Sequence, residues 1–342
     1  MTRVLVTGGS GFIGQYLVPA LAARGREVRV LDLRAPARAK PEVTYVQGSV
    51  LDRELVDDAL RGVEEVYHLA GLPGMWMPQK SDFHAVNCRG TEVVIAAARK
   101  RGITRFLHCS TESILFRPPP SEDAVGDDAT LSADDMPGPY TRSKLLAEQL
   151  AAQAAAAGFP LVIACPTMPI GPHDHYLTPP AAMLRHFLGR RFQFYLDFVV
   201  NLVDVRDVAA GLVLAMERGQ VGHRYILGGE SIPLKTILRL MAEASGHRGV
   251  LLPVPRRLAQ LAATILEFTA DHVTHRPPSA TIEGVRIALR ATALSIKKAQ
   301  SELGYTPQTV EPALRETISD LLGAGASGVN RRYSTRNDAF ET

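Results

Sequence analysis

The feature that most constrains the fold is a glycine-rich turn near the start of the chain. A short apolar run over Val4–Val6 is typical of a buried parallel strand. Three glycines follow at three-residue spacing, where the apolar stretch Phe12–Ala23 predicts a helix: Gly8, Gly11 and Gly14. Such glycines permit a tight turn, a close approach of backbone N–H groups to a pyrophosphate, and packing of the helix on its strand. We therefore predict a dinucleotide site here, the alternative being a glycine-rich turn without a ligand.

An acidic residue occupies the position that such sites use to hold the adenosine ribose. Glu27–Leu33 predicts a second strand, and Asp32 near its end lies 18 residues beyond Gly14. A carboxylate there accepts hydrogen bonds from the ribose hydroxyls, which favours NAD. The 2′-phosphate of NADP would meet Asp32 as a like charge, although Arg34 would attract it, so NADP is the alternative.

Strand-like and helix-like stretches alternate through the first half of the chain. They are Val4–Val6, Phe12–Ala23, Val28–Leu31, Leu51–Leu60, Val66–Ala70, Thr91–Lys100, Arg105–Cys109, Tyr140–Ala157 and Leu161–Cys165. This alternation predicts an α/β fold with a Rossmann-type, doubly wound parallel sheet. Ligands of such sheets gather at the carboxyl ends of the strands.

The alternation becomes irregular after residue 171. Asn201–Val205 and Tyr225–Leu227 predict further strands, and the sequence between them predicts a helix. The predicted division is a Rossmann domain that binds NAD (1–171 plus 201–229), a smaller, mainly helical substrate-binding lobe (172–200 plus 230–322) and a mobile tail (323–342).

Composition narrows the class of protein. The chain has 342 residues, of which 46% are hydrophobic and 21% charged, and a net charge of +3. These values are ordinary for a globular protein, and so small a charge without a long basic run argues against nucleic-acid binding. Three cysteines without a C-x-x-C pair indicate a reducing compartment and no structural metal.

No leader-like segment precedes the first strand, so we expect a cytoplasmic protein. The apolar stretch Leu258–Phe268 is too short to cross a bilayer, which predicts no stable membrane insertion. We interpret this stretch as a core or amphipathic helix, with weak contact with a membrane surface as the alternative.

Tyr140 and Lys144, four residues apart at the start of an Ala-rich stretch, are predicted to share one helical face. A nearby ammonium, together with the positive nicotinamide of an oxidised cofactor, favours the phenolate, so Tyr140 can exchange a proton with an alcohol oxygen near neutral pH. Thr111, just beyond the strand Arg105–Cys109, is predicted to bind the same oxygen, with Ser110 as the alternative. A Y-x-x-x-K pair by itself is an ordinary helical pair, but after a dinucleotide turn it indicates hydride-transfer chemistry.

Four further side chains are candidate substrate contacts: Trp76, Glu112, His173 and His175. Trp76 would form a wall of an apolar pocket, or else part of a local core. The two histidines lie in a Pro-rich loop and, without further ligands, indicate a substrate loop or surface rather than a metal site. Glu112 follows the active-site hydroxyl and would act on a proton, the alternative being a solvated or salt-bridged residue.

Several stretches together resemble one family. They are Thr7–Gly14, His68–Ala70, Val86–Thr91, Tyr140–Lys144, Asn201–Ala209, Tyr225–Gly229 and Leu303–Pro307, and they span about residues 1 to 322. The sequence is similar to extended short-chain dehydrogenases/reductases of the NAD-dependent epimerase/dehydratase superfamily. Within it, the chain most resembles dihydroflavonol reductase-like proteins and hopanoid-associated sugar epimerases.

This resemblance implies roles for particular residues. The implied catalytic triad is Thr111, Tyr140 and Lys144. The implied cofactor contacts are Gly8, Gly11, Phe12, Ile13, Gly14, Asp32, Leu69, Ala70, Asn87, Tyr140, Lys144 and Pro166. It also implies a homodimer formed through the Tyr140 helix and its neighbour Thr91–Lys100.

The sequence departs from the family's pattern at two places. Ser49 stands where the family often has an aspartate near the adenine, which puts a side-chain contact to the adenine in doubt. Glu112 stands where the reductase-like branch has a small or apolar residue. Nucleotide-sugar dehydratases carry acidic residues after the active-site threonine, but Ser113 follows here, so the dehydratase pattern is incomplete.

We therefore predict an NAD-dependent oxidoreductase that transfers a hydride between the nicotinamide and a small-molecule secondary alcohol or ketone. The alternative is a nucleotide-sugar epimerase, or less favourably a dehydratase, that keeps its NAD tightly bound. A non-enzymatic NAD sensor is a third hypothesis, against which the intact Tyr140 and Lys144 argue.

Overall fold

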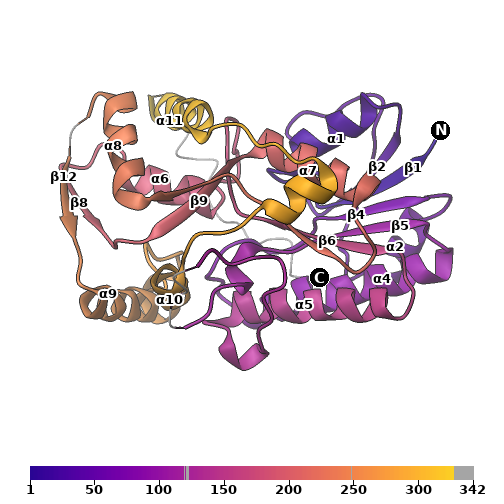
Figure 1. Ribbon diagram of the computed structural model, residues 1–342, viewed down its shortest axis with the longest axis horizontal. Coiled ribbons are helices and arrows are strands. Elements are labelled where there is room, and N and C mark those ends of the chain that lie inside the picture. Colours follow the sequence, from indigo (N-terminus) through magenta and orange to yellow (C-terminus); the bar gives the residue numbers. More distant parts are fainter. Residues whose placement is uncertain (119, 121–122, 248, 327–342) are drawn as a thin grey trace.

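A seven-stranded sheet, with every neighbouring pair of strands parallel, forms the centre of the larger part of the molecule (Figure 1). The computed structural model describes residues 1–118, 120, 123–247 and 249–326. In spatial order the strands are β10 (Arg224–Leu227), β6 (Leu161–Pro166), β5 (Arg105–Cys109), β4 (Glu65–His68), β1 (Arg3–Thr7), β2 (Glu27–Asp32) and β3 (Thr44–Gln47). The predicted doubly wound parallel sheet is confirmed.

Helices cover both faces of this sheet (Figure 1). One face packs against α1 (Gly14–Ala22) and α7 (Val205–Arg218), and the other against α2 (Arg53–Ala59), α4 (Gly90–Arg101) and α5 (Pro139–Ala156). Each strand sends alternate side chains to the two cores, as Leu5 and Val6 of β1 illustrate. Because both faces of the sheet are buried, most of its strands are rich in apolar residues, and these stretches allowed the strands to be predicted from the sequence.

The strand order reverses between β1 and β4. From β1 the chain continues outward to β2 and β3, and from β4 it continues outward in the other direction to β5, β6 and β10. The carboxyl ends of β1 and β4 therefore form the topological switch point, where open α/β sheets bind their ligands. Thr7 and His68 face each other in the register at this point.

The rest of the chain forms two small sheets among helices, on the left in Figure 1. The strands are β7 (Met168–Ile170), β9 (Val199–Asp204) and β11 (Glu230–Pro233) in one sheet, and β8 (Phe192–Tyr195) and β12 (Val250–Pro253) in the other. The helices are α6 (Pro179–Phe187), α8 (Leu234–Ser245), α9 (Arg256–Thr269), α10 (Ile282–Arg290) and α11 (Val310–Ala326). None of the described helices has the length and hydropathy that a membrane span requires.

Three features of this region differ from the sequence-based expectation. The strand expected at Asn201–Val205 pairs with β7 and β11 rather than with the large sheet. Strands β8, β11 and β12 were not predicted, because each has four residues, too few for a periodic pattern of apolar side chains. Helix α11 continues to Ala326, so the first residues of the expected tail are helical, while 327–342 lie outside the described residues.

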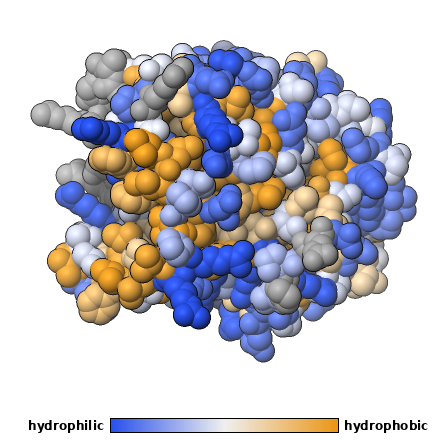
Figure 2. All heavy atoms as spheres, turned by 60° about the vertical axis from the view of Figure 1, so that its left-hand side comes forward, coloured by the Kyte–Doolittle hydropathy of each residue, from blue (hydrophilic) through white to orange (hydrophobic). Residues whose placement is uncertain are grey.

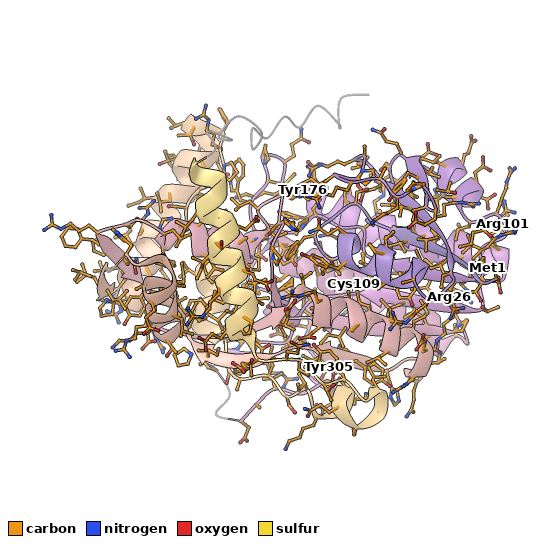
Figure 3. The ribbon with its side chains drawn as sticks, turned by 90° about the horizontal axis from the view of Figure 1, so that it is seen from above. Met1, Arg26, Arg101, Cys109, Tyr176 and Tyr305 are labelled. Atoms are coloured by element: carbon orange, nitrogen blue, oxygen red, sulfur yellow. The ribbon has the colours of Figure 1, made fainter. Side chains whose placement is uncertain are left out.

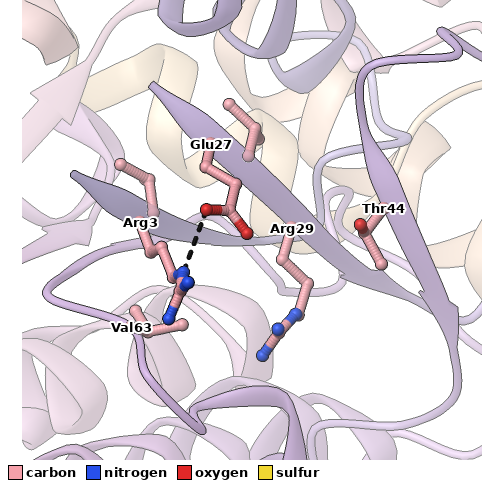
Figure 4. A pocket seen from close by; sticks show the side chains of 7 residues that line it. Arg3, Glu27, Arg29, Thr44 and Val63 are labelled. Carbon is pink, nitrogen blue, oxygen red and sulfur yellow. Dashed lines mark hydrogen bonds and ion pairs between the residues drawn. The ribbon is translucent and has the colours of Figure 1, made fainter. Parts of the chain in front are cut away.

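The amino-terminal edge of the large sheet carries a small hollow lined by Arg3, Glu27, Arg29, Thr44 and Val63 (Figure 4). An ion pair crosses it, with Arg3 Nε 2.9 Å from Glu27 Oε2, and both side chains are half exposed. Met1 marks this end of the molecule in Figure 3, whereas Cys109, at the carboxyl end of β5, lies toward the middle. The hollow is therefore at the edge opposite to the one where such sheets bind ligands.

Gly14 provides a test of the turn's packing. A Cβ on Gly14 would lie 2.4 Å from the carbonyl oxygen of Gly9, and backbone cannot yield as a flexible side chain can. We expect Gly14→Ala to lower the free energy of unfolding by about 1–3 kcal/mol, measured by urea denaturation. Gly323→Ala in α11 is the matched control, because no described atom lies within 4 Å of its new Cβ. Equal stability of the two variants would contradict this packing.

Candidate active site

The glycine-rich turn lies directly against the segment that follows β4. Gly8 has a φ of +72°, and a Cβ on it would lie 2.7 Å from the backbone nitrogen of Ala70. The backbone N–H groups of Leu69 and Ala70 donate to the carbonyl and the hydroxyl oxygen of Thr7. Only glycine fits at position 8, because both the backbone conformation and the space exclude a side chain.

The turn also presents a buried hydroxyl that has no hydrogen-bond partner among the described residues, Ser10 Oγ. Buried polar atoms are almost always paired, and a phosphate oxygen is a suitable acceptor. The turn is followed by the N-terminus of α1, which favours an anion. These features fit the pyrophosphate of a dinucleotide.

Asp32, at the end of β2, faces this turn. Its Oδ2 accepts from the backbone N–H of Ser10 and its Oδ1 from that of Arg34, both at 3.0 Å. Burial raises the pKa of Asp32, and these N–H donors oppose the rise. The Arg34 guanidinium lies 5.0 Å from the ring centre of Tyr176, so this cation already contacts an aromatic face.

A buried histidine connects β1, β4 and α4 at the switch point. His68 Nδ1 lies 2.7 Å from the Thr7 hydroxyl, and Nε2 lies 3.0 Å from the Thr91 hydroxyl. The Thr91 hydroxyl donates to the carbonyl oxygen of Asn87, which leaves it to accept from Nε2–H. We assign the Nε2–H tautomer from this network. Burial lowers the pKa of His68 to about 3, so the imidazole is neutral. Its role is structural, because its two hydrogen bonds join Thr7 of β1 to Thr91 of α4.

Asn87 continues this network toward the candidate reacting groups. It lies in a π-helical turn, His84–Arg89, between β4 and α4. Its side-chain oxygen accepts from the N–H of Leu72 at 2.7 Å, and its amide donates to Ser143 Oγ at 3.0 Å. The Ser143 hydroxyl donates to the carbonyl oxygen of Tyr140. Asn87 thus joins the segment after β4 to the first turn of α5.

Thr111, Tyr140 and Lys144 meet at the carboxyl end of β5. Lys144 Nζ donates to the carbonyl oxygen of Cys109 at 2.8 Å, and the Thr111 hydroxyl is hydrogen-bonded to the Tyr140 phenol. The ring of Phe83 packs edge-on against that of Tyr140, with 5.9 Å between ring centres. The structure therefore brings together the three side chains that the sequence suggested.

Burial dominates the electrostatics of this trio in the cofactor-free protein. Burial raises the pKa of the Tyr140 phenol, and the hydrogen bond between this phenol and Thr111 only partly opposes the rise. Burial also lowers the pKa of Lys144, whose ammonium is held by the Cys109 carbonyl. Desolvation outweighs the opposing hydrogen bond with Thr111, so the phenol is protonated in the cofactor-free protein.

Glu112 is neither solvated nor salt-bridged in the structure. Only 8% of the residue is exposed, and its Oε2 accepts from the Thr111 hydroxyl at 3.1 Å. Burial raises its pKa to about 7, against the opposing effect of this hydrogen bond. A carboxyl that exchanges its proton near neutral pH therefore lies beside Thr111.

A second buried carboxyl at this site, Glu283 of α10, was not among the residues predicted from the sequence. Its Oε1 accepts from both the N–H and the hydroxyl of Thr141 at 2.7 Å, and its Oε2 accepts from the N–H of Tyr140 at 3.1 Å. A carboxylate at the N-terminus of α5 satisfies N–H groups that have no partner within the helix. No motif surrounds Glu283, and the contact spans more than 140 residues of chain, so no local pattern reports it.

The structure places the other candidate residues on several further elements. The carbonyl of His173 accepts from Gln15 of α1 at 3.0 Å, and the ring of His173 stacks on that of His175, so this loop lies beside the dinucleotide turn. The Trp76 indole donates to Asp271 at 2.7 Å, in the turn that follows α9. Phe12 and Ile13 directly precede α1, and Pro166 is buried at the end of β6. The functional roles of all these residues stay predictions.

Known proteins are similar to this chain along most of its length. Residues 4–228 match the family described as the NAD dependent epimerase/dehydratase family. A putative dihydroflavonol 4-reductase of Synechocystis sp. is 32% identical over 326 residues, covering 92% of each chain. The 4-hydroxy-2-methyl-3-oxo-4-farnesyl-3,4-dihydroquinoline-1-oxide ketoreductase of Stigmatella aurantiaca is 31% identical over 337 residues, covering 95% of this chain and 97% of that protein.

A similar solved structure is the UDP-glucose 4-epimerase of Thermus thermophilus in complex with NAD. It superimposes with a TM-score of 0.75 at 23% identity, covering 94% of this chain and 100% of that one. This likeness supports the same fold.

The buried Glu112 makes stability depend on pH. Its pKa rises from 4.5 to about 7 on folding, so between these values the folded protein holds a proton that the unfolded chain has released. The free energy of unfolding contributed by this group therefore falls as the pH rises through that window. Glu112→Gln removes this titration and should gain up to about 3 kcal/mol of stability relative to the parent between about pH 5 and about pH 8.

Urea denaturation of both proteins at the two pH values measures this difference. Glu311→Gln is the control, because Glu311 is exposed and forms an ion pair with Arg315 in the next helical turn. A stability difference between Glu112→Gln and the parent that does not change with pH would contradict the assignment.

Proposed function

The chain belongs to the NAD-dependent epimerase/dehydratase family, and we propose that it transfers a hydride between NAD and a secondary alcohol or its ketone. The observation that carries this proposal is the convergence of Thr111, Tyr140 and Lys144 beside Cys109, at the carboxyl edge of the sheet. That edge also carries the glycine-rich turn and Asp32. The presence of acid–base groups and a predicted dinucleotide site on the same edge of the sheet supports the assignment as an oxidoreductase.

NAD would be held by groups already described. The backbone of the turn from Gly8 to Gly14 and the Ser10 hydroxyl would bind the pyrophosphate, and Asp32 would bind the adenosine ribose. Lys144 would bind the nicotinamide ribose. When bound, NAD supplies the hydride acceptor for alcohol oxidation, or its reduced form supplies the donor for ketone reduction.

Tyr140 is the proposed acid and base. For ketone reduction, its Oη–H donates a proton to the substrate oxygen, and the raised pKa keeps this proton in place at neutral pH. For alcohol oxidation, the phenol first passes its proton through the Thr111 hydroxyl to the Glu112 carboxylate, and Oη then accepts the proton of the alcohol. The Thr111 hydroxyl would bind the substrate oxygen and hold it next to the phenol.

Glu112 extends this proton path. The Thr111 hydroxyl is bonded both to the phenol and to the Glu112 carboxyl, and the pKa of that carboxyl is about 7. We infer that Glu112 stores the proton that Tyr140 loses or gains. Glu283, the other buried carboxyl of the site, is engaged by the N–H groups of Tyr140 and Thr141. One available carboxyl beside Thr111 fits proton storage better than dehydration, for which the family uses further acidic residues.

A redox role is favoured over sugar epimerisation. Two relatives that span nearly the whole chain carry reductase names. An epimerase also needs cationic groups that hold a nucleotide diphosphate. Arg286 and Arg290 of α10 instead donate to the backbone carbonyls of Pro137 and Asp135, and so support the start of α5.

The test is an NADH absorbance assay with a panel of secondary alcohols, ketones and nucleotide sugars. Tyr140→Phe should lower kcat at least about 100-fold on whichever substrate turns over, because it removes the general acid. Tyr45→Phe on β3 is the matched control and should retain activity. Turnover of Tyr140→Phe at the parental rate would refute the role of Tyr140.

Native mass spectrometry separates the two candidate functions. A dehydrogenase exchanges its NAD freely and shows net formation or consumption of NADH. Tightly retained NAD, with inversion of a sugar centre and no net NADH, would overturn the redox proposal in favour of epimerisation.

A further inference from the structure

Helix α9 turns its apolar side away from the protein. Leu258, Leu261, Ile265 and Phe268 repeat at three- and four-residue spacing and form one stripe, here named the α9 stripe. These four residues are between 56 and 62% exposed. An amphipathic helix on a globular protein normally buries such a stripe, so α9 shows the reverse arrangement.

The polar side of α9 is fixed to the body of the protein. Glu267 is buried, and its two oxygens accept from Lys80 Nζ and from the backbone N–H of Ile282, both at 2.7 Å. Asp271, just beyond the helix, accepts from Lys80 Nζ at 2.9 Å and from the Trp76 indole. Rotating α9 to bury its stripe would break these bonds and leave Glu267 unpaired, at a large cost.

These contacts also determine the charge of the outer face. Residues 255–277 contain two carboxylates, Glu267 and Asp271, and each forms an ion pair with Lys80. The exposed charged or titratable side chains of this segment are all basic: Arg256, Arg257, His272, His275 and Arg276. The exposed surface of this segment therefore combines apolar side chains with cationic ones, and its two carboxylates, Glu267 and Asp271, are both paired with Lys80.

Neighbouring elements enlarge this surface. Strands β8 and β12 lie at the same end of the molecule as α9 (Figure 1), and β12 leads directly into it. Phe192, Phe194 and Val250 of these strands are at least half exposed. Figure 2, which brings this end forward, shows hydrophobic side chains gathered on it beside hydrophilic ones. Isolated exposed apolar residues are normal, but this many at one end of the molecule indicate an interaction surface.

We propose that α9 lies on an anionic lipid bilayer, with its stripe at the boundary between headgroups and acyl chains. An outward apolar stripe bordered by arginines suits this occupant, because it gains from apolar burial and from attraction to lipid phosphates. A second copy of the chain suits it less well. A two-fold interface on this face would bring Arg256 and Arg257 close to like charges. The proposal is independent of the reaction catalysed.

The test is flotation of the full chain with vesicles of phosphatidylcholine alone and of phosphatidylcholine with phosphatidylglycerol. The parent should float with the anionic vesicles and much less with the neutral ones. The double variant Ile265→Ser/Phe268→Ser should reduce the bound fraction at least about tenfold, since each change removes most of a buried side chain's apolar transfer energy. Val221→Ser is the matched control, because Val221 is 47% exposed in the turn between α7 and β10.

Two further measurements test the electrostatic contribution to vesicle binding and the location of the contact. Arg256→Gln/Arg257→Gln should weaken binding to anionic vesicles by roughly fivefold per arginine, and added salt should reduce the binding of the parent. Trp76, the single tryptophan, is bonded to Asp271 at the end of α9, and its fluorescence should change when anionic vesicles are added. A thermal melt of each variant verifies that it is folded.

Two outcomes would overturn the proposal. One is a parent protein that does not bind anionic vesicles at low salt. The other is a dimer, seen by light scattering, that Ile265→Ser/Phe268→Ser converts to a monomer, because the stripe would then be covered by a second copy of the chain.

Discussion

The candidate site depends on the close contact between β1 and β4 where the strand order reverses. The backbone at Gly8 approaches Ala70 too closely for any side chain, and the Thr7 hydroxyl bonds to both Ala70 and His68. A charged imidazole could not be buried here, and its lowered pKa keeps it neutral. From this contact the bonds run through Thr91 and Asn87 to α5, so the dinucleotide turn and the reacting groups share one rigid support.

Helix α5 is held at two points by groups from different parts of the chain. Glu283 binds its N-terminus from α10, and Lys144 ties its second turn to the end of β5. The segment after β4 is likewise connected to α9 through Lys80 and Trp76. The C-terminal helices therefore do more than cover a substrate, because two of them contact the elements that hold the reacting groups. A bilayer that fixes α9 would orient this edge of the sheet toward the lipid.

The parts of the structure that could be predicted from the sequence are those with a local signal. Strand β5 begins and ends at the residues predicted from the sequence, and the glycine spacing located the turn, because each pattern arises within about ten residues. Strands β3 and β8 have four residues each and carry no such periodicity. Glu283 could not be found because its partners lie more than 140 residues away. Spacing reveals the lysine four residues from Tyr140 but not the burial that raises the pKa of the phenol in the cofactor-free protein.

The burial of Glu112 costs stability, and the same burial prepares this carboxyl for proton exchange. Burying a carboxyl costs stability, and this chain keeps one at 8% exposure with a threonine hydroxyl as its side-chain donor and no cation paired with it among the described residues. A buried structural carboxylate usually gains an arginine, as Glu148 does from Arg224 in this protein. An unpaired one has its pKa moved toward neutrality, which is unfavourable for the fold and useful for proton exchange. The buried carboxyl that lowers the stability of the fold lies one residue from Thr111. Because of this position we assign Glu112 to the proton path rather than to the core.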